Sequence, residues 1–178
     1  MCIRDRARPP STTPPIIAGW WTDETSPQKD RAKWYREEIP RTETWAFKEG
    51  DPQKHIAALE MMGTLVLFKL IGHHCSTSRH AITTLKTDNQ ANVHSLTKER
   101  AKKWPGADIM MELVVAAQRV GATPHIIHVK RGYNIWADQL THHPPDLQGF
   151  DPARRHRFDL ADDTNWDIWH TLRQRPTW

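Results

Sequence analysis

Ile56-Ala57-Ala58-Leu59-Glu60-Met61-Met62-Gly63-Thr64-Leu65 is the stretch that decides the fold of this chain. Its apolar side chains recur at helical spacing, and Glu60 lies on the same stripe, next to Leu59. A glutamate in an apolar helical stripe is costly unless it is paired or bound to a metal ion. The alternative is a glutamate at the edge of the stripe that reaches solvent or an arginine. Glu60 is therefore the first candidate functional residue.

Two further carboxylates stand at the ends of expected elements. Asp88 follows a β-branched stretch, residues 81–87, and Asp138 lies early in an expected short helix, residues 134–142. Taken alone, Asp88 suits a turn or an N-cap, and Asp138 suits the dipole of its helix. Taken together with Glu60, they offer hard oxygen ligands on three rigid elements. Such ligands suit Mg²⁺, and a pair of these ions about 4 Å apart promotes phosphodiester cleavage.

The rest of the chain predicts strands that alternate with helices, which indicates an α/β fold with a mixed sheet. Gly19 interrupts the first strand and predicts a close backbone approach, whereas Gly72 and Gly121 are expected to stop helices. Asp51 and Pro52 form the expected start of the first helix. The expected strands are 16–22, 33–39, 81–87 and 124–129, and the expected helices are 51–70, 89–103, 108–120, 134–142 and 165–172.

Composition bounds the class of protein. The 178 residues suit one domain, and the formal charge of +4 with a pI near 9.2 permits a polyanionic partner without proving one. Two cysteines cannot build a disulfide framework. The longest apolar run, residues 56–70, falls short of the roughly 20 residues that span a bilayer, and Glu60 and Lys69 interrupt it. With no apolar leader in the first ten residues, we expect an intracellular protein, cytoplasmic or nuclear, without a membrane span.

Two other groups of residues have weaker functional interpretations. His73, His74, Cys75 and His80 could form a zinc cluster, but no second ligand pair has finger-like spacing, so a polar loop is favoured. Glu112 is a helix-interior glutamate like Glu60, and we expect it at the edge of the core rather than on a metal.

The ordered motifs of the chain resemble the ribonuclease H-like domain at the C-terminal end of retroelement reverse transcriptases. The resemblance covers roughly residues 16–172 and implies a ribonuclease H-like mixed sheet flanked by helices. Each motif is short, but the ordered set is fairly specific. The matching stretches are Ala18-Gly19-Trp20-Trp21, residues 56–65, Thr87-Asp88-Asn89-Gln90-Ala91-Asn92, Met110-Met111-Glu112-Leu113, residues 129–140, and Phe150-Asp151-Pro152 with Arg154-Arg155.

The resemblance implies an enzyme that cuts the RNA strand of an RNA–DNA hybrid with two Mg²⁺ or Mn²⁺ ions, downstream of a reverse transcriptase domain. Carried over by motif, the catalytic metal ligands would be Glu60, Asp88 and Asp138. Asn134 would hold the turn before Asp138. The substrate contacts would come from Asn89 and Gln90, beside the scissile backbone.

The start of the chain departs from that family. A first-strand aspartate is expected about a dozen residues before Gly19, where residues 7–15 are proline-rich. Asp5 is the nearest carboxylate, but it belongs to Met-Cys-Ile-Arg-Asp-Arg, which resembles the translation of a sequencing adapter. We therefore expect residues 1–15 to be non-native or disordered, residues 16–143 to form the ribonuclease H-like domain, and residues 144–178 to form an extension.

Three functions remain open at this point. The first is a truncated hybrid ribonuclease. The second is a degenerate, catalytically inactive ribonuclease H-like module that binds nucleic acid, which the missing first aspartate favours. The third is an integrase-like nuclease of the same fold that acts on duplex DNA.

Overall fold

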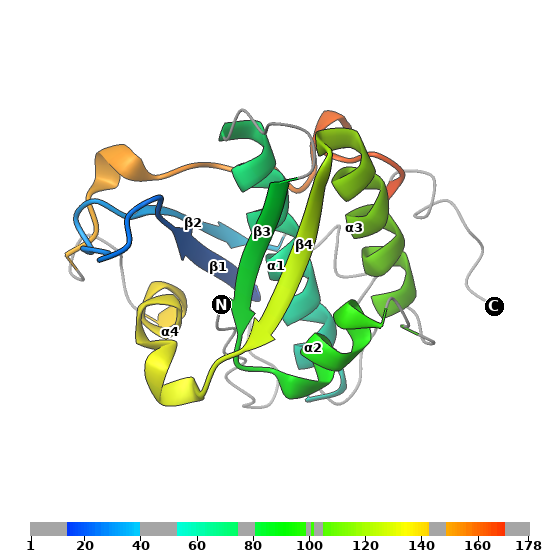
Figure 1. Cartoon of the computed structure of the whole chain (residues 1–178), viewed down its shortest axis with the longest axis horizontal. Helices are drawn as coiled ribbons and strands as arrows, with labels where there is room; N and C mark the ends of the chain where they lie inside the picture. The colour runs from blue at the N-terminus through cyan, green and yellow to red at the C-terminus, as the bar shows by residue number, and fades with distance from the viewer. Residues whose placement is uncertain are drawn as a thin grey trace.

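A computed structural model describes residues 14–39, 53–74, 81–98, 101, 105–142 and 149–169. Helices and strands alternate along the chain, as expected for the α/β class (Figure 1). The elements are β1 (Ile16–Trp21), β2 (Lys33–Glu38), α1 (Gln53–His74), β3 (Ala81–Thr87), α2 (Gln90–Thr97), α3 (Gly106–Val120), β4 (Ala122–His128), η2 (Arg131–Tyr133), α4 (Ile135–His142), η4 (Pro152–Arg154) and η5 (Asp163–Asn165).

The described strands form two separate pairs rather than the single mixed sheet that the sequence predicts. β1 and β2 pair antiparallel, with Gly19 opposite Tyr35, and β3 and β4 pair parallel, with Leu85 opposite Ile126. No described strand joins β1 to β3. The strand that the sequence analysis expects before β1 would come from residues 1–13 or from further upstream, outside the described residues. The described elements thus confirm the α/β class, whereas the ribonuclease H-like sheet stays a prediction.

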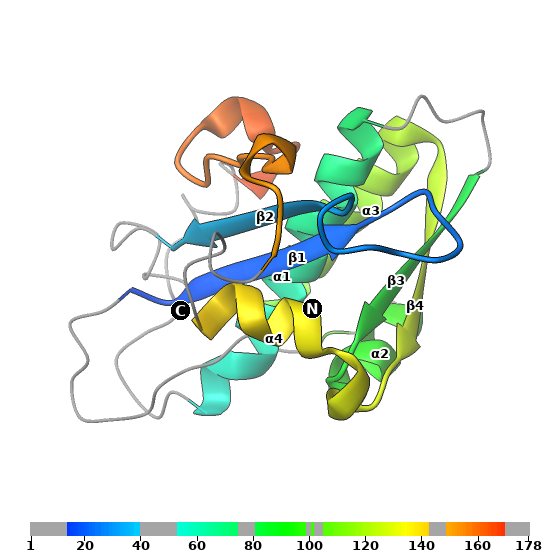
Figure 2. The same cartoon turned by 90° about the vertical axis from the view of Figure 1, so that its left-hand side faces the viewer.

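The helix α1 is the centre of the molecule. It contacts β1, β3, α2 and α3, and Figures 1 and 2 show it behind both strand pairs. Residues 58–70 are all buried, so the helix is enclosed on every side and does not present only one apolar stripe. By length and composition Ile56–His74 could cross a membrane, but 72% of that window is buried inside the protein, as in a core helix.

The predicted stop of α1 at Gly72 is wrong, because the helix continues to His74. A Cβ atom at Gly72 would lie 3.0 Å from Cγ1 of Val120, the last residue of α3. The glycine therefore allows α1 and α3 to approach each other. Gly121 does end α3 as predicted, with φ of 67° in the left-handed region. The expected N-terminal residues of α1, Asp51 and Pro52, lie outside the described residues.

The close approach predicted at Gly19 is present. A Cβ atom there would lie 2.7 Å from Cε1 of Tyr35, the residue opposite on β2. The Tyr35 ring is fully buried, and its hydroxyl donates a 2.7 Å hydrogen bond to the carbonyl oxygen of Gly63 in α1. Burial raises the pKa of Tyr35 well above its ordinary value, so the phenol stays a donor. Gly19 and Tyr35 together fix the β1–β2 pair on α1.

Residues 149–169 pack into the same core and are not a detached extension. Phe158, Leu160, Trp166 and Trp169 are buried among side chains of α1 and α3, and Figure 2 shows this segment above β2. The helix expected at 165–172 is wrong for residues 166–168, which are not helical. The backbone N–H groups of Asp167 and Ile168 donate to the Glu112 carboxylate, at 2.6 and 2.8 Å. Residues 170–172 lie outside the described residues.

Four charged side chains anchor this segment. The Lys69 ammonium lies 2.6 Å from Glu112 Oε1 and 2.6 Å from Asp167 Oδ2, and the side chains of Lys69 and Glu112 are fully buried. Arg119 adds a 2.9 Å ion pair to the other oxygen of Asp167. Glu112, expected at the edge of the core, is thus a buried ion-pair partner that joins α3 to α1 and to the C-terminal segment.

Candidate functional site

Glu60 is buried, with 6% of its surface exposed, and its carboxylate meets an amide rather than an ammonium or guanidinium group. Asn92, on α2, donates from Nδ2 to Glu60 Oε2 at 3.3 Å and to the carbonyl oxygen of Ala57 at 2.9 Å. Asn92 is only 2% exposed, and these two hydrogen bonds satisfy its buried amide N–H groups. The stripe position of Glu60 therefore places a carboxylate inside the core, where α1 meets α2.

The electrostatic setting of Glu60 disfavours its charged form. The pKa of Glu60 is raised to about 7: burial raises it most, a side-chain hydrogen bond with Asn89 lowers it, and the charge of Asp88 raises it. Near neutral pH this carboxyl group is therefore partly protonated. A bound cation would favour the charged form, as metal ions do for carboxylates near them.

Asn134 contacts both of the other acidic residues, Asp88 through a carboxylate oxygen and Asp138 through its backbone. Its Nδ2 donates a 3.2 Å hydrogen bond to Asp88 Oδ1, and its carbonyl oxygen accepts a 3.1 Å bond from the backbone N–H of Asp138. Asn134 is 6% exposed, whereas the Asp138 side chain is 37% exposed. Arg131 Nη2 lies 3.9 Å from Asp138 Oδ1. Asp88 at the end of β3 and Asp138 at the start of α4 are thus held at the same end of the β3–β4 pair.

The two expected substrate contacts lie at the start of α2. Asn89 is the N-cap, and its Oδ1 accepts a 3.1 Å hydrogen bond from the backbone N–H of Asn92. Gln90 is the first residue of the helix, and its side chain is exposed. Asn89 therefore has a structural role beside the Glu60 carboxyl group, whereas Gln90 is accessible from solvent.

The carboxylate oxygens of this region are ligands that suit a hard cation, although few of them lie close together. Glu60 and Asp88 supply carboxylate oxygens near each other, and carboxylate oxygens are the ligands that Mg²⁺ and Mn²⁺ prefer. Within the described ranges, however, no three His, Cys, Asp or Glu side chains gather closely enough to hold a metal ion. Of the zinc alternative, His73 and His74 lie exposed at the end of α1, and Cys75 and His80 are outside the described residues.

Sequence reasoning missed the roles of Asn92 and Arg131. Asn92 stands three residues after the N-cap Asn89, so one helical turn brings the two amides near Glu60. That spacing was visible in the sequence. The role of Arg131 was not visible, since its position against Asp138 depends on the fold of the turn after β4.

Comparisons with protein-family models, with curated proteins and with solved structures found no match to this chain.

Proposed function

We propose that this chain is a metal-dependent nuclease domain of the ribonuclease H type, which cuts the RNA strand of RNA–DNA hybrids. The observation that carries the proposal is that amide side chains bind the Glu60 and Asp88 carboxylates, with Asp138 at the same end of β3 and β4. Asn92 contacts Glu60, and Asn134 contacts Asp88 through its side chain and Asp138 through its backbone. The Glu60 and Asp88 carboxylates lie near enough that the charge of Asp88 raises the pKa of Glu60, a repulsion that a bound cation would relieve.

Each residue has a defined role in this proposal. Glu60, Asp88 and Asp138 would hold Mg²⁺ or Mn²⁺, which supplies an activated water and neutralises charge on the leaving oxygen. Asn134 would orient the Asp88 carboxylate, and its carbonyl oxygen accepts a hydrogen bond from the backbone N–H of Asp138. Asn89 and Gln90, at the exposed start of α2, would contact the sugars and phosphates of the hybrid, where the 2′-hydroxyl distinguishes RNA from DNA.

The proposal includes a central strand from upstream polypeptide, in the parent protein that carries a reverse transcriptase domain. The two strand pairs both rest on α1, and no described strand joins them. A strand between β1 and β3 would complete the mixed sheet that the motifs imply, and it would carry a fourth carboxylate. Between Asp5 and Gly19 the chain has no acidic residue to supply it.

The test is cleavage of a labelled RNA–DNA hybrid with Mn²⁺, by this chain and by a version with an acidic first strand restored upstream. We expect strong cleavage only by the restored version. Glu60→Gln in the restored version should abolish cleavage, whereas Glu38→Gln, at an exposed position of β2, should not change it. Cleavage that survives Glu60→Gln would refute the site assignment.

A degenerate module that binds hybrid without cutting it is the second candidate. The lack of a three-ligand cluster among the described residues supports this alternative. It predicts salt-sensitive hybrid binding that Mg²⁺ does not alter, and no cleavage by the restored version either.

A further inference from the structure

The turn between β4 and α4 presents an exposed ring and two cations beside the carboxylates. Tyr133 is 80% exposed and Ile135 is 52% exposed, and these are two of the four large hydrophobic residues that are exposed among the described ones. Lys130 and Arg131 precede them and are exposed as well. We call Lys130, Arg131, Tyr133 and Ile135 the turn surface. An exposed tyrosine ring beside the candidate site offers a face on which a sugar or base can stack.

The backbone of the turn surface is ordered by hydrogen bonds and tied to the site. The N–H of Tyr133 donates to the carbonyl oxygen of Lys130 at 2.8 Å, and the N–H of Asn134 donates to that of Arg131 at 3.0 Å. Asn134 in turn holds Asp88. Just before the turn, the N–H of Val129 donates to the carbonyl oxygen of Thr87 and extends the β3–β4 hydrogen bonding into the turn. The ring of Tyr133 is therefore presented from a defined backbone, one residue from the side chain that orients Asp88.

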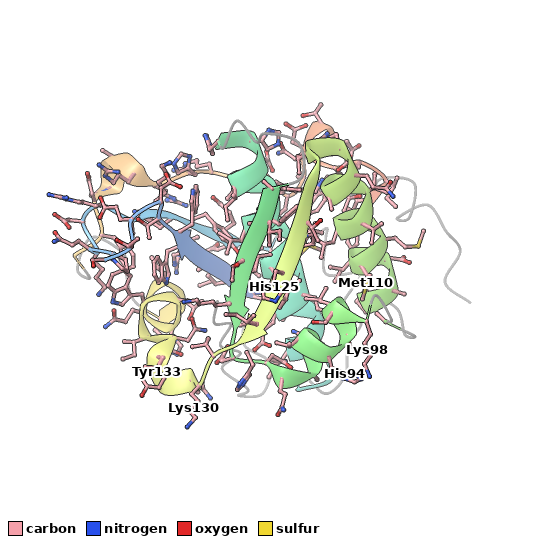
Figure 3. The ribbon with its side chains drawn as sticks, in the orientation of Figure 1. His94, Lys98, Met110, His125, Lys130 and Tyr133 are labelled. Carbon is pink, nitrogen blue, oxygen red and sulfur yellow. The ribbon has the colours of Figure 1, made fainter. Side chains whose placement is uncertain are left out.

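The charges of this region complement a nucleic-acid backbone. Glu60, Asp88 and Asp138 would repel phosphates, so a polyanion needs cations beside them. The Arg131 guanidinium is 70% exposed, and its contact to Asp138 is 3.9 Å, beyond hydrogen-bond length. It can therefore reach a phosphate without losing a short ion pair. Figure 3 shows Lys130 and Tyr133 at the same end of the molecule as His94 and Lys98, which lie on and just after α2.

We infer that the turn surface is a backbone clamp for the nucleic acid next to the cleavage site, with Tyr133 stacking on a sugar or base and Arg131 binding a phosphate. This inference rests on the proposed function, because the partner is the same hybrid. It goes further by assigning substrate contacts to Tyr133 and Arg131, neither of which is a metal ligand. Aromatic stacking supplies affinity without sequence preference, and arginine–phosphate contacts fix the register of the strand.

The test is equilibrium binding of a fluorescent RNA–DNA hybrid by the full chain in EDTA, where no cleavage can occur. Tyr133→Ala should weaken binding by about 5- to 150-fold, the usual effect of removing one base–aromatic stack. Tyr133→Phe should retain the affinity, because the ring remains. Arg131→Ala should lower the slope of log affinity against log salt concentration by about 1.

Two exposed positions elsewhere serve as matched controls. Ile82 is 73% exposed at the start of β3, the opposite end from Asp88, and Arg157 is exposed on the C-terminal segment. Ile82→Ala and Arg157→Ala should leave the affinity and the salt slope of hybrid binding unchanged.

The outcomes separate the two proposals. If the chain binds hybrid and both Tyr133→Ala and Arg131→Ala bind like the wild type, the clamp is refuted while the proposed function stands. If neither the chain nor its restored version binds hybrid at any salt concentration, the proposed function fails and the clamp fails with it. Thermal unfolding of each variant, expected to match that of the wild type at such exposed positions, verifies that the variants are folded.

Discussion

Glu60 shows how a single buried side chain connects the core to the candidate site. Its place in the apolar run predicted a paired or metal-bound carboxylate, and the structure gives it amide partners, Asn92 and Asn89. Amides can hold the protonated or the charged carboxyl group, whereas an ammonium partner would have fixed the charge. This residue therefore remains able to respond to a cation.

The raised pKa of Glu60 makes its charge a cost to folding when no cation is bound. Between the unfolded value of 4.5 and the folded value of about 7, the folded state binds more protons, so stability falls as pH rises through this window. Glu60→Gln removes that charge. We expect it to raise the free energy of unfolding at pH 8 in EDTA by up to about 3 kcal/mol, and to change it little near pH 4.5.

Urea denaturation at both pH values measures this effect. Glu38→Gln, at an exposed site on β2, should change stability by less than about 0.5 kcal/mol at either pH. If Glu60→Gln were neutral or destabilising at pH 8, the buried carboxyl group would not carry the cost inferred here.

Gly19 gives a second prediction at the residue scale. In Gly19→Ala the new methyl group would overlap the Tyr35 ring, which is buried and bonded to Gly63 and therefore cannot move without loss. We expect a loss of about 1–3 kcal/mol in the free energy of unfolding, typical of overpacking. Gly132→Ala is the matched control, because no atom lies within 4 Å of its Cβ position. Equal stability of the two variants in urea would contradict the close approach at β1.

At the scale of elements, the sequence correctly predicted the features that depend on residues close together in the chain. Strand β3 and the end of α3 at Gly121 were predicted to the residue, because β-branched runs and a left-handed glycine act locally. The helix expected through Trp166 was wrong, and residues 166–168 are instead fixed by hydrogen bonds from two N–H groups to the carboxylate of Glu112, more than fifty residues away in sequence. The helix stop predicted at Gly72 was wrong for a similar reason, because Gly72 packs against Val120, which is distant in sequence.

The ion pairs of Lys69 yield a prediction about how the C-terminal segment is attached. Lys69→Met would leave the buried carboxylate of Glu112 without its ammonium partner. We expect a loss of about 3–5 kcal/mol in the free energy of unfolding, the usual cost of removing one member of a buried pair. Lys33→Met is the control, because Lys33 pairs with an exposed aspartate, Asp23, and should cost less than about 1 kcal/mol.

Limited proteolysis adds a second measurement to the same variants. The segment 149–169 should become cleavable in Lys69→Met and stay protected in Lys33→Met. Protection that is unchanged in a destabilised Lys69→Met chain would show that apolar packing alone holds the segment.

At the scale of the whole molecule, the α/β class followed from alternating patterns, but the joining of the two strand pairs did not. Sheet formation depends on partners that are distant in sequence, and no described strand joins the β1–β2 pair to the β3–β4 pair. The candidate site shares this dependence. Glu60, Asp88 and Asp138 were found from local motifs, but their separations are properties of the assembled sheet.

The pH dependence of stability also belongs to the whole molecule, because carboxyl groups with raised pKa values and histidines with lowered pKa values act in opposite directions. Burial, the nearby His74 and Lys33 lower the pKa of His156, so His156 destabilises the fold as pH falls below about 6.5. Its ring lies 4.1 Å from that of His74, at the end of α1, and 4.9 Å from that of Trp21 on β1. In the wild type, Glu60 opposes this trend by stabilising the fold over the same range.

Thermal unfolding of Glu60→Gln between pH 7 and 5.5 removes the opposing contribution of Glu60, and adding His156→Phe then separates His156 from His73, whose pKa is also lowered by partial burial. The midpoint of this variant should fall on acidification, and the fall should be smaller when His156→Phe is added, because phenylalanine keeps the ring but cannot be protonated. Parallel pH profiles of the single and double variants would exclude His156 as the source.

The buried ammonium of Lys69 also bears on how the chain is made. Asp167, one of its two carboxylate partners, lies 98 residues further along the chain. At about 5–20 residues per second, a ribosome needs roughly 5–20 s to add that distance, during which α1 has its apolar surface but not its full set of counter-charges. The nascent helix should therefore be a chaperone-binding segment. Release from the chaperone should coincide with emergence of the C-terminal segment rather than with completion of the strands.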